Sequence, residues 1–190
     1  MFDSGSLRSI VGKSRLPAII ATVVALPVAV VAGVFAFQFM TATAEESEPE
    51  ADLTPVSVEV PALEGEDAVI CLALTATAPD TAGELPARPV EGGERASEFV
   101  LAYGDPAVVA TCGAAAVEIE DTAPVFKLNG VCWFSEENGD GSSWVTLDRQ
   151  VPVAVEFPAE FEQPSDVLND LSTVIAEKVK AAETAPTGCA

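Results

Sequence analysis

The sequence predicts an α+β domain with a mainly antiparallel sheet covered by two helices, preceded by one N-terminal transmembrane helix. Three observations lead to this prediction. A charge-free apolar run lies near the N-terminus, short alternating segments separated by turn residues fill the middle, and an amphipathic segment lies near the C-terminus. Strands followed by a helix are typical of domains in which helices cover an antiparallel sheet.

Residues 16–40 form the predicted transmembrane anchor. These 25 residues carry no charge, three cations precede them, and an acidic run follows. A helix rising about 1.5 Å per residue crosses a hydrocarbon core about 30 Å thick over this length. The cations place residues 1–15 in the cytoplasm and the rest of the chain outside. We therefore expect a single-pass protein of the cell membrane with an extracytoplasmic C-terminal domain.

The alternative interpretation of this run is a cleaved signal peptide. Residues 42–44 read Ala-Thr-Ala, a pattern that a signal peptidase can cut. The apolar core of a signal peptide is only about 7 to 15 residues long, however, so the length of the run favours an uncleaved anchor.

Small side chains recur every four residues within the predicted anchor. Such a stripe allows another transmembrane helix to pack closely, although Ala and Val are also common in anchors that pack against nothing. The anchor predicts the membrane as a partner, and the stripe predicts another membrane protein as a second partner. Its members are Ala21, Ala25, Ala29 and Gly33.

Charge excludes several functions for the exported part. After the apolar run the chain has 29 acidic residues and six basic ones, an excess of 23 negative charges. A surface this acidic repels phosphate backbones, so we expect no binding to nucleic acid. The chain also contains no histidine, which removes the commonest general base, the usual catalytic triads and most zinc sites. We expect no cofactor and no metal site.

The exported domain is predicted to begin after an acidic linker. Residues 41–53 combine acids, small residues and a proline without apolar periodicity, whereas residues 54–190 contain regular patterns. The valines of 56–60 alternate with polar residues, which predicts a half-buried strand ended by Pro61. A short helix carrying Cys71 is predicted next, followed by an irregular connection through Arg88, Pro89 and the glycines after them.

Strands are predicted along most of the remaining chain. Asn138-Gly139-Asp140-Gly141 is a strong hairpin signal. The acids around it suggest a calcium loop as an alternative, but the last ligand of such a loop would fall on Leu147, which has no carboxylate. A turn is therefore favoured. The expected strands are 97–103, 106–112, 117–120, 125–129, 131–134, 144–147 and 151–157.

The last predicted element is an amphipathic helix that should lie on the sheet. Pro164 and Ser165 precede it, and it runs from Asp166 to about Ala182. Its apolar side chains share one face, which must be buried. They are Val167, Leu168, Leu171, Val174, Ile175 and Val179.

Four cysteines predict two disulfides, because an exported domain folds in an oxidising compartment. Three pairings are possible. We favour Cys112 with Cys132, which lie in strands expected to be neighbours, and Cys71 with Cys189, which would tie a helix to the C-terminal tail. A redox or metal role would call for a C-x-x-C pair or histidines, and the sequence has neither.

Several short pieces, in order, resemble the actinobacterial domain-of-unknown-function family numbered thirty-five fifteen. The resemblance covers roughly residues 56–182 and departs from the family pattern at Tyr103, Thr111 and Cys132. It implies a membrane-anchored or secreted protein and no particular activity. The pieces are Arg88-Pro89-Val90, Gly104 to Val109 running into Cys112-Gly113, Gly130-Val131 before Trp133, Thr146 to Arg149 leading into Val151 to Pro158, and a last helix with Leu168, Leu171 and Ser172.

Two functional hypotheses follow. The first is a non-enzymatic accessory or interaction domain of the cell envelope or of a membrane complex. The alternative is a carboxylate-dependent enzyme or small-ligand-binding domain of the envelope. The candidate surface-site residues are Tyr103, Asp105, Trp133 and Arg149. Asp105 could instead only cap a turn, and Arg149 is expected to form a structural salt bridge with a neighbouring acid.

Overall fold

The structure, a computed structural model, describes residues 53–120 and 122–189. The predicted anchor, with its stripe of small residues, lies outside the described residues, as does most of the predicted linker. Among the helices of the described part, none combines the length and the hydrophobicity that a membrane crossing needs.

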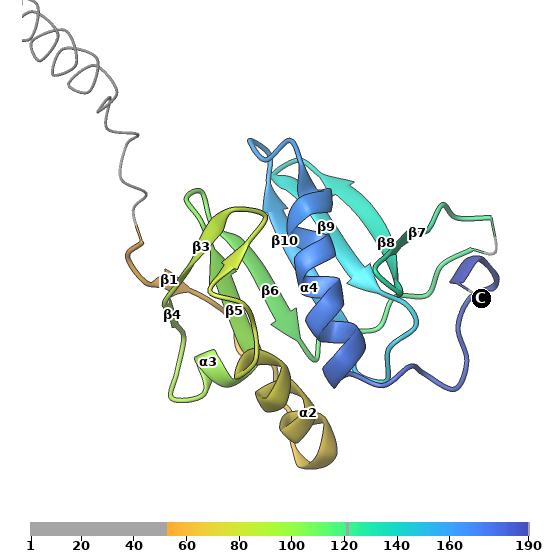
Figure 1. The fold of residues 1–190 in the computed structure, drawn as a ribbon, viewed down its shortest axis with the longest axis horizontal. Helices are drawn as coiled ribbons and strands as arrows, with labels where there is room; N and C mark the ends of the chain where they lie inside the picture. The colour runs from red at the N-terminus through yellow and green to blue at the C-terminus, as the bar shows by residue number, and fades with distance from the viewer. Residues whose placement is uncertain (1–52, 121, 190) are drawn as a thin grey trace, which may run out of the picture. The chain divides into compact units, whose positions relative to one another are not determined.

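An eight-stranded sheet forms the centre of the fold, in the order β2-β3-β5-β6-β10-β9-β8-β7 (Figure 1). Every neighbouring pair is antiparallel, which confirms the predicted sheet type. The strands are β2 (Thr81–Ala82), β3 (Leu85–Arg88), β5 (Val100–Tyr103), β6 (Val108–Cys112), β7 (Phe126–Leu128), β8 (Val131–Asn138), β9 (Gly141–Thr146) and β10 (Val153–Pro158).

Two more strands, β1 (Val56–Ser57) and β4 (Val90–Glu91), form a separate parallel pair. The region around Pro89 was expected to be irregular, but β3 ends just before this residue and β4 begins just after it. The Pro89 carbonyl accepts a hydrogen bond of 2.9 Å from the Val56 N–H, which helps to pair β4 with β1. Residues 117–120, expected to be a strand, have no strand structure. The chain leaves the sheet at Gly113, which adopts a φ of 84° that favours glycine.

The described chain has three α-helices where the sequence predicted two: α2 (Gly65–Thr75), α3 (Ala96–Phe99) and α4 (Pro164–Lys178). The third is the short α3, which occupies the start of the strand expected at 97–103. Helix α4 ends four residues earlier than predicted. The residues after it are extended instead, because Lys180 accepts a backbone hydrogen bond of 2.9 Å from Gln150.

The β8–β9 hairpin forms where the Asn-Gly-Asp-Gly signal predicted it. Asn138 pairs with Gly141, and the Asn138 Oδ1 atom accepts a hydrogen bond of 3.1 Å from the Asp140 N–H. A Cβ atom on Gly141 would overlap the Phe157 carbonyl oxygen, so this position requires glycine.

The sheet has a covered face and an open face. The covered face carries the buried alternate residues of β10, namely Val153, Val155 and Phe157, and α4 lies across it (Figure 1). Full burial of such side chains stabilises a fold by about 1.5 to 3 kcal/mol each. Helix α4 contributes the face predicted from its periodicity, including Leu168 and Leu171, both 2% exposed or less.

The open face carries the alternate residues of the same strands, which point away from α4. Val109 and Thr111 of β6 are half-buried there, as is Ala154 of β10, while Glu156 is exposed. The register places all four on one side of the sheet, because Ala154 pairs with Thr111 and Glu156 with Val109. Towards β5 this face is covered by the chain that follows β1, whose Val58 and Val60 pack against the core.

Candidate functional site

The structure contains two disulfides, as the cysteine count predicted, but the predicted pairing was wrong. Cys71 is bonded to Cys112, and Cys132 to Cys189, with a Cα–Cα distance of 5.5 Å in each case. The predicted Cys112–Cys132 bond is impossible because β10 and β9 lie between β6 and β8. Three strand spacings amount to about 14 Å, roughly twice the span of a disulfide.

Tyr103, predicted at the surface, is fully buried at the end of β5. Its hydroxyl donates a hydrogen bond of 3.1 Å to the Pro79 carbonyl oxygen. Burial, and secondarily the negative charge of Asp80, raises the pKa of Tyr103 to about 12. The phenol therefore stays protonated at physiological pH and serves as a structural donor.

Asp105 follows β5 at the surface, with 44% of its side chain exposed, and lies 3.8 Å from the Nη1 atom of Arg88. Arg88 is buried and organises this end of the domain. Its guanidinium donates to the Gly104 carbonyl at 2.8 Å and twice to the Thr54 carbonyl, at 3.1 and 2.6 Å. Arg88 was not among the candidates, although it is one of only six cations after the apolar run.

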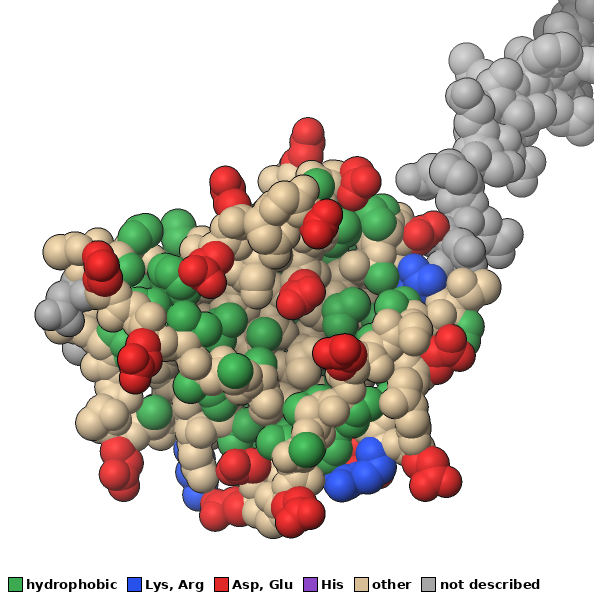
Figure 2. All heavy atoms as spheres, turned by 180° about the vertical axis from the view of Figure 1, so that it is seen from behind, with side chains coloured by type: hydrophobic (Ala, Val, Ile, Leu, Met, Phe, Trp, Pro, Cys, Tyr) green, Lys and Arg blue, Asp and Glu red, His purple; other side chains and the backbone are tan. Residues whose placement is uncertain are grey.

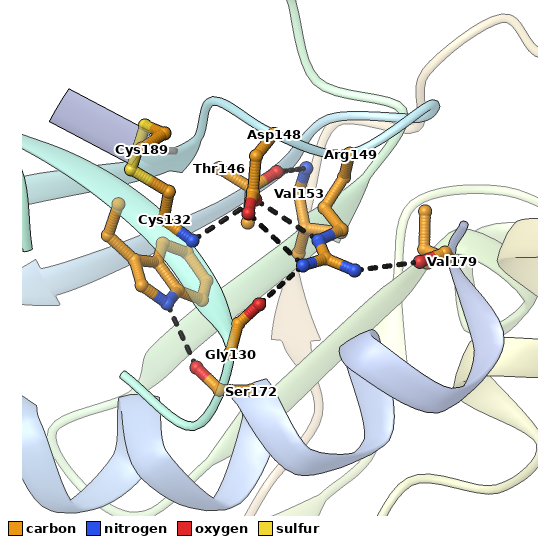
Figure 3. A network of polar contacts seen from close by, with 10 residues as sticks. Gly130, Cys132, Thr146, Asp148, Arg149, Val153, Ser172, Val179 and Cys189 are labelled. Atoms are coloured by element: carbon orange, nitrogen blue, oxygen red, sulfur yellow. Dashed lines mark hydrogen bonds and ion pairs between the residues drawn. A yellow bond between two sulfur atoms is a disulfide. The ribbon is translucent and has the colours of Figure 1, made fainter. Parts of the chain in front are cut away.

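Trp133, also predicted at the surface, lies buried on the covered face of β8. Its indole N–H donates a hydrogen bond of 2.9 Å to the Oγ atom of Ser172 on α4 (Figure 3). Ser172 is fully buried and was not a candidate either. Its signal in the sequence was a hydroxyl inside the apolar face of the last helix.

Arg149 forms the salt bridge expected of it, with Asp148 as its partner (Figure 3). The contact is bidentate: Nε lies 3.1 Å from Oδ1 and Nη2 lies 3.1 Å from Oδ2. Arg149 also donates to the carbonyls of Val179 and Gly130. The Cys132 N–H donates to Asp148 Oδ1 at 3.1 Å. This network ties the β7–β8 turn, the β9–β10 connection and the end of α4 together.

The four candidates therefore do not form one surface site. Tyr103 and Asp105 belong to the end of β5, whereas Trp133 and Arg149 lie on and near β8, with three strands between. Both oxygens of Asp148 accept hydrogen bonds within the fold. Within residues 53–120 and 122–189, no three cysteine or acidic side chains are grouped so that they could hold a metal ion. As a set, these residues stabilise the domain.

The open face offers a different kind of site, the open-face groove. It has a volume of about 560 Å³ and runs beside the segment that follows β1. Its floor is formed by Val109, Thr111 and Ala154, and its two acids are Glu59 and Glu156, both exposed. Figure 2 shows this side of the molecule, where acidic side chains stand among apolar patches and basic side chains are few.

Residues 57–61 form one wall of the open-face groove and residues 113–115 lie at its end. Glycine is favoured at position 113 because its φ of 84° is one that other residues rarely adopt, and a Cβ atom there would also push the Leu63 side chain aside. The groove could not be foreseen from local patterns, because its wall lies about 50 residues from Val109 and Thr111 and about 95 residues from Ala154 in the chain, and their approach depends on the sheet order.

Comparison with known proteins places the chain in a family. A search of the curated proteins and a search of the solved structures each found no match. A family model described as "Protein of unknown function (DUF3515)" matches residues 24–184, which include the whole eight-stranded sheet and α4. The chain therefore belongs to the DUF3515 family of proteins of unknown function, the family that its ordered short motifs indicated.

Proposed function

We propose that this protein is a non-enzymatic, extracytoplasmic interaction domain held at a cell membrane by residues 16–40. One observation carries the proposal. The polar residues that looked suited to chemistry are committed to the fold, Arg149 through Asp148 and two carbonyls, and Trp133 through Ser172. The open-face groove, by contrast, presents Val109, Thr111 and Ala154 to the solvent, a mixture of apolar and polar surface like that of interfaces between independently folded proteins.

At the open-face groove, the alternative function, a carboxylate-dependent enzyme or ligand-binding domain, would have to use Glu59 and Glu156, because they are the acids that line it. Both side chains are exposed. A carboxyl group that donates a proton at neutral pH is normally kept in an apolar, partly dehydrated pocket. Exposure of both acids therefore favours the interaction function.

The membrane attachment is supported by the sequence and by the extent of the family. The apolar run is long enough to cross a bilayer, and the family match begins at residue 24, inside that run. Intact-mass measurement of the protein from native membranes tests whether the anchor is retained. A mature N-terminus at Glu45 would show that the run is a cleaved signal.

The interaction function is tested by photo-crosslinking on native membranes. A photoreactive amino acid replaces Thr111 on the groove floor, and in a matched control it replaces Ser165, which is exposed at the start of α4. We expect one partner to crosslink from Thr111 and not from Ser165, and to co-purify with the full chain in mild detergent. Absence of any partner from both positions, together with purification of the chain alone, would overturn the proposal.

The small-residue stripe gives the partner a second possible contact, inside the membrane. Replacement of Ala25 and Ala29 by Ile blocks close helix approach, whereas replacement of Val24 and Val30 by Leu, off the stripe, is the control. Loss of the partner in the first pair alone would place the main contact in the bilayer. If the partner is fully retained after residues 16–40 are exchanged for an unrelated apolar helix, this segment serves only to attach the domain to the membrane.

A further inference from the structure

We propose that the open-face groove receives an extended, basic segment of another protein, which adds to β1 as a third strand of the small β1–β4 sheet. This inference rests on the proposed interaction function and specifies the chemistry of the partner. It is carried by three properties of the groove: a free strand edge along its wall, a floor of small and β-branched side chains beneath that edge, and acids beside it.

The wall of the groove is a strand edge with unused backbone groups. The N–H groups of Val56 and Val58 donate to the carbonyls of Pro89 and Glu91, at 2.9 and 2.7 Å. Because backbone groups alternate along a strand, those of Ser57 face the opposite side, along the groove. An exposed edge of this kind is a template for an added strand.

This edge is already formed in the free domain. The two hydrogen bonds from Arg88 to the Thr54 carbonyl fix the chain immediately before β1. On the side of β4, a Cβ atom on Gly92 would overlap the Val58 carbonyl, so the two segments approach as closely as glycine permits. A preformed edge reduces the conformational entropy that a partner must overcome on binding.

The floor suits the side chains of an added strand. Alternate side chains of such a strand would point towards the half-buried Val109, Thr111 and Ala154. Val58 and Val60 show a comparable arrangement, since both pack against the core from the segment that follows β1. Small or β-branched apolar residues at every second position of the partner fit this floor.

Charge selects a basic partner. Glu59 and Glu156 are exposed in the groove, and two of the six cations after the apolar run, Arg88 and Arg149, are buried elsewhere. The chain's own residues 41–53 contain five acids and no base, so like charge disfavours them as occupants. A second copy of this acidic domain is disfavoured for the same reason.

The test uses the purified full chain in detergent and a fluorescent peptide of about eight residues in which Val and Lys alternate. One control peptide has Glu in place of Lys. Another keeps the lysines but carries N-methyl groups on alternate backbone nitrogens, which blocks strand pairing on one edge. We expect only the unmodified Val–Lys peptide to bind, with an affinity that falls as salt rises.

Three variants of the chain locate the binding. Ser57→Pro removes an edge N–H and should weaken binding at least about tenfold. The double variant Glu59→Lys/Glu156→Lys should do the same. Glu183→Lys, a charge reversal outside the groove, should have little effect. Circular dichroism verifies that each variant is folded, and if Ser57→Pro is unfolded, Thr111→Arg, which fills the floor, replaces it.

Each contrary result has a definite meaning. Equal binding of the Glu peptide, or binding unaffected by both N-methylation and Ser57→Pro, would overturn strand addition by a basic segment. A dimer of the chain that Ser57→Pro dissociates would make the occupant a second copy, which also overturns it. If the native partner still crosslinks to the charge-reversed variant, this inference fails while the proposed function stands. If no native partner exists, the proposed function fails whatever the peptide does.

Discussion

The two faces of the central sheet are built from the same strands and differ in what they require of each residue. On the covered face, Val155 is fully buried against the core, and its neighbour on the open face, Glu156, is exposed. Side chains on the covered face interlock with α4, so a change in their shape is a change in stability. Exposed side chains on the open face, such as Glu156, can change with little effect on stability, which leaves them available for binding.

The difference extends to polar groups. On the covered face, Thr146 Oγ1 accepts a hydrogen bond of 2.9 Å from the Val153 N–H, and Trp133 donates to Ser172. Among the described residues, every buried side-chain nitrogen and oxygen atom has a hydrogen-bond partner. On the open face, the backbone groups of Ser57 along the groove are unused. The fold thus satisfies its polar groups where water is absent and leaves some available where water can reach them.

The largest effect is expected on the covered face, from Trp133→Ala. The substitution leaves a cavity against α4 and removes the hydrogen bond to Ser172, which should lower the free energy of unfolding by about 3 to 5 kcal/mol. Urea denaturation followed by circular dichroism measures it. A loss below about 1 kcal/mol would mean that α4 does not pack on Trp133 as described.

The network at the end of α4 should be nearly as sensitive. Arg149→Met removes the partner of the largely buried Asp148 carboxylate and the donor to Gly130, which should cost about 3 kcal/mol. The double variant Asp148→Asn/Arg149→Met should lose less than the sum of the two single losses, because the two residues interact directly. Additive losses in the same denaturation assay would contradict the ion pair.

Alkaline pH should lower the free energy of unfolding through Tyr103, which is buried at the end of β5. Folding raises the pKa of Tyr103 from 10.0 to about 12, so the folded state favours the protonated phenol. This contribution, of order 2 to 3 kcal/mol, is fully present below pH 10 and is lost as the pH rises towards 12. Tyr103 is the only tyrosine, so ultraviolet titration of the phenolate reads it directly. Tyr103→Phe should flatten the dependence of stability on pH in this window.

The smallest effect is expected on the open face. Glu59→Lys/Glu156→Lys replaces two exposed acids, so the free energy of unfolding should change by no more than about 0.5 kcal/mol per site. The same variant should bind the basic Val–Lys peptide much more weakly than the unchanged chain does. A marked loss of stability would show that side chains on the open face support the fold as much as those on the covered face do. That result would contradict the contrast between the two faces.

Local patterns in the sequence predicted most of the fold, because they depend on near neighbours. The hairpin at Asn138–Gly141 requires only its turn residues, and α4 requires only its periodicity. The disulfide pairing failed because it depends on the order of strands in the sheet, which alternation does not encode. The strand predicted at residues 117–120 was wrong for a related reason. These residues alternate as a strand does, but the chain has already left the sheet at Gly113.

The candidate site was harder to predict than the fold. Tyr103 and Trp133 were candidate surface-site residues, but both are buried, and the partners that hold them, Pro79 and Ser172, are 24 and 39 residues away in the chain. Arg149 was correctly expected to pair with a neighbouring acid, since Asp148 is adjacent. The open-face groove could not be predicted at all, because a free strand edge is defined by what does not pair with it.

The corrected disulfides also determine how the domain would respond to tension. The shortest covalent path from Thr54 to Cys189 runs to Cys71, crosses to Cys112, continues to Cys132 and crosses again. Most of the eight-stranded sheet, and all of α4, lie in two sealed loops that bear no load. Full extension is therefore limited to roughly 140 Å instead of roughly 470 Å. While both bridges are oxidised, a pull on the ends can straighten β1 and start α2 unwinding, but it cannot draw out β9, β10 or α4.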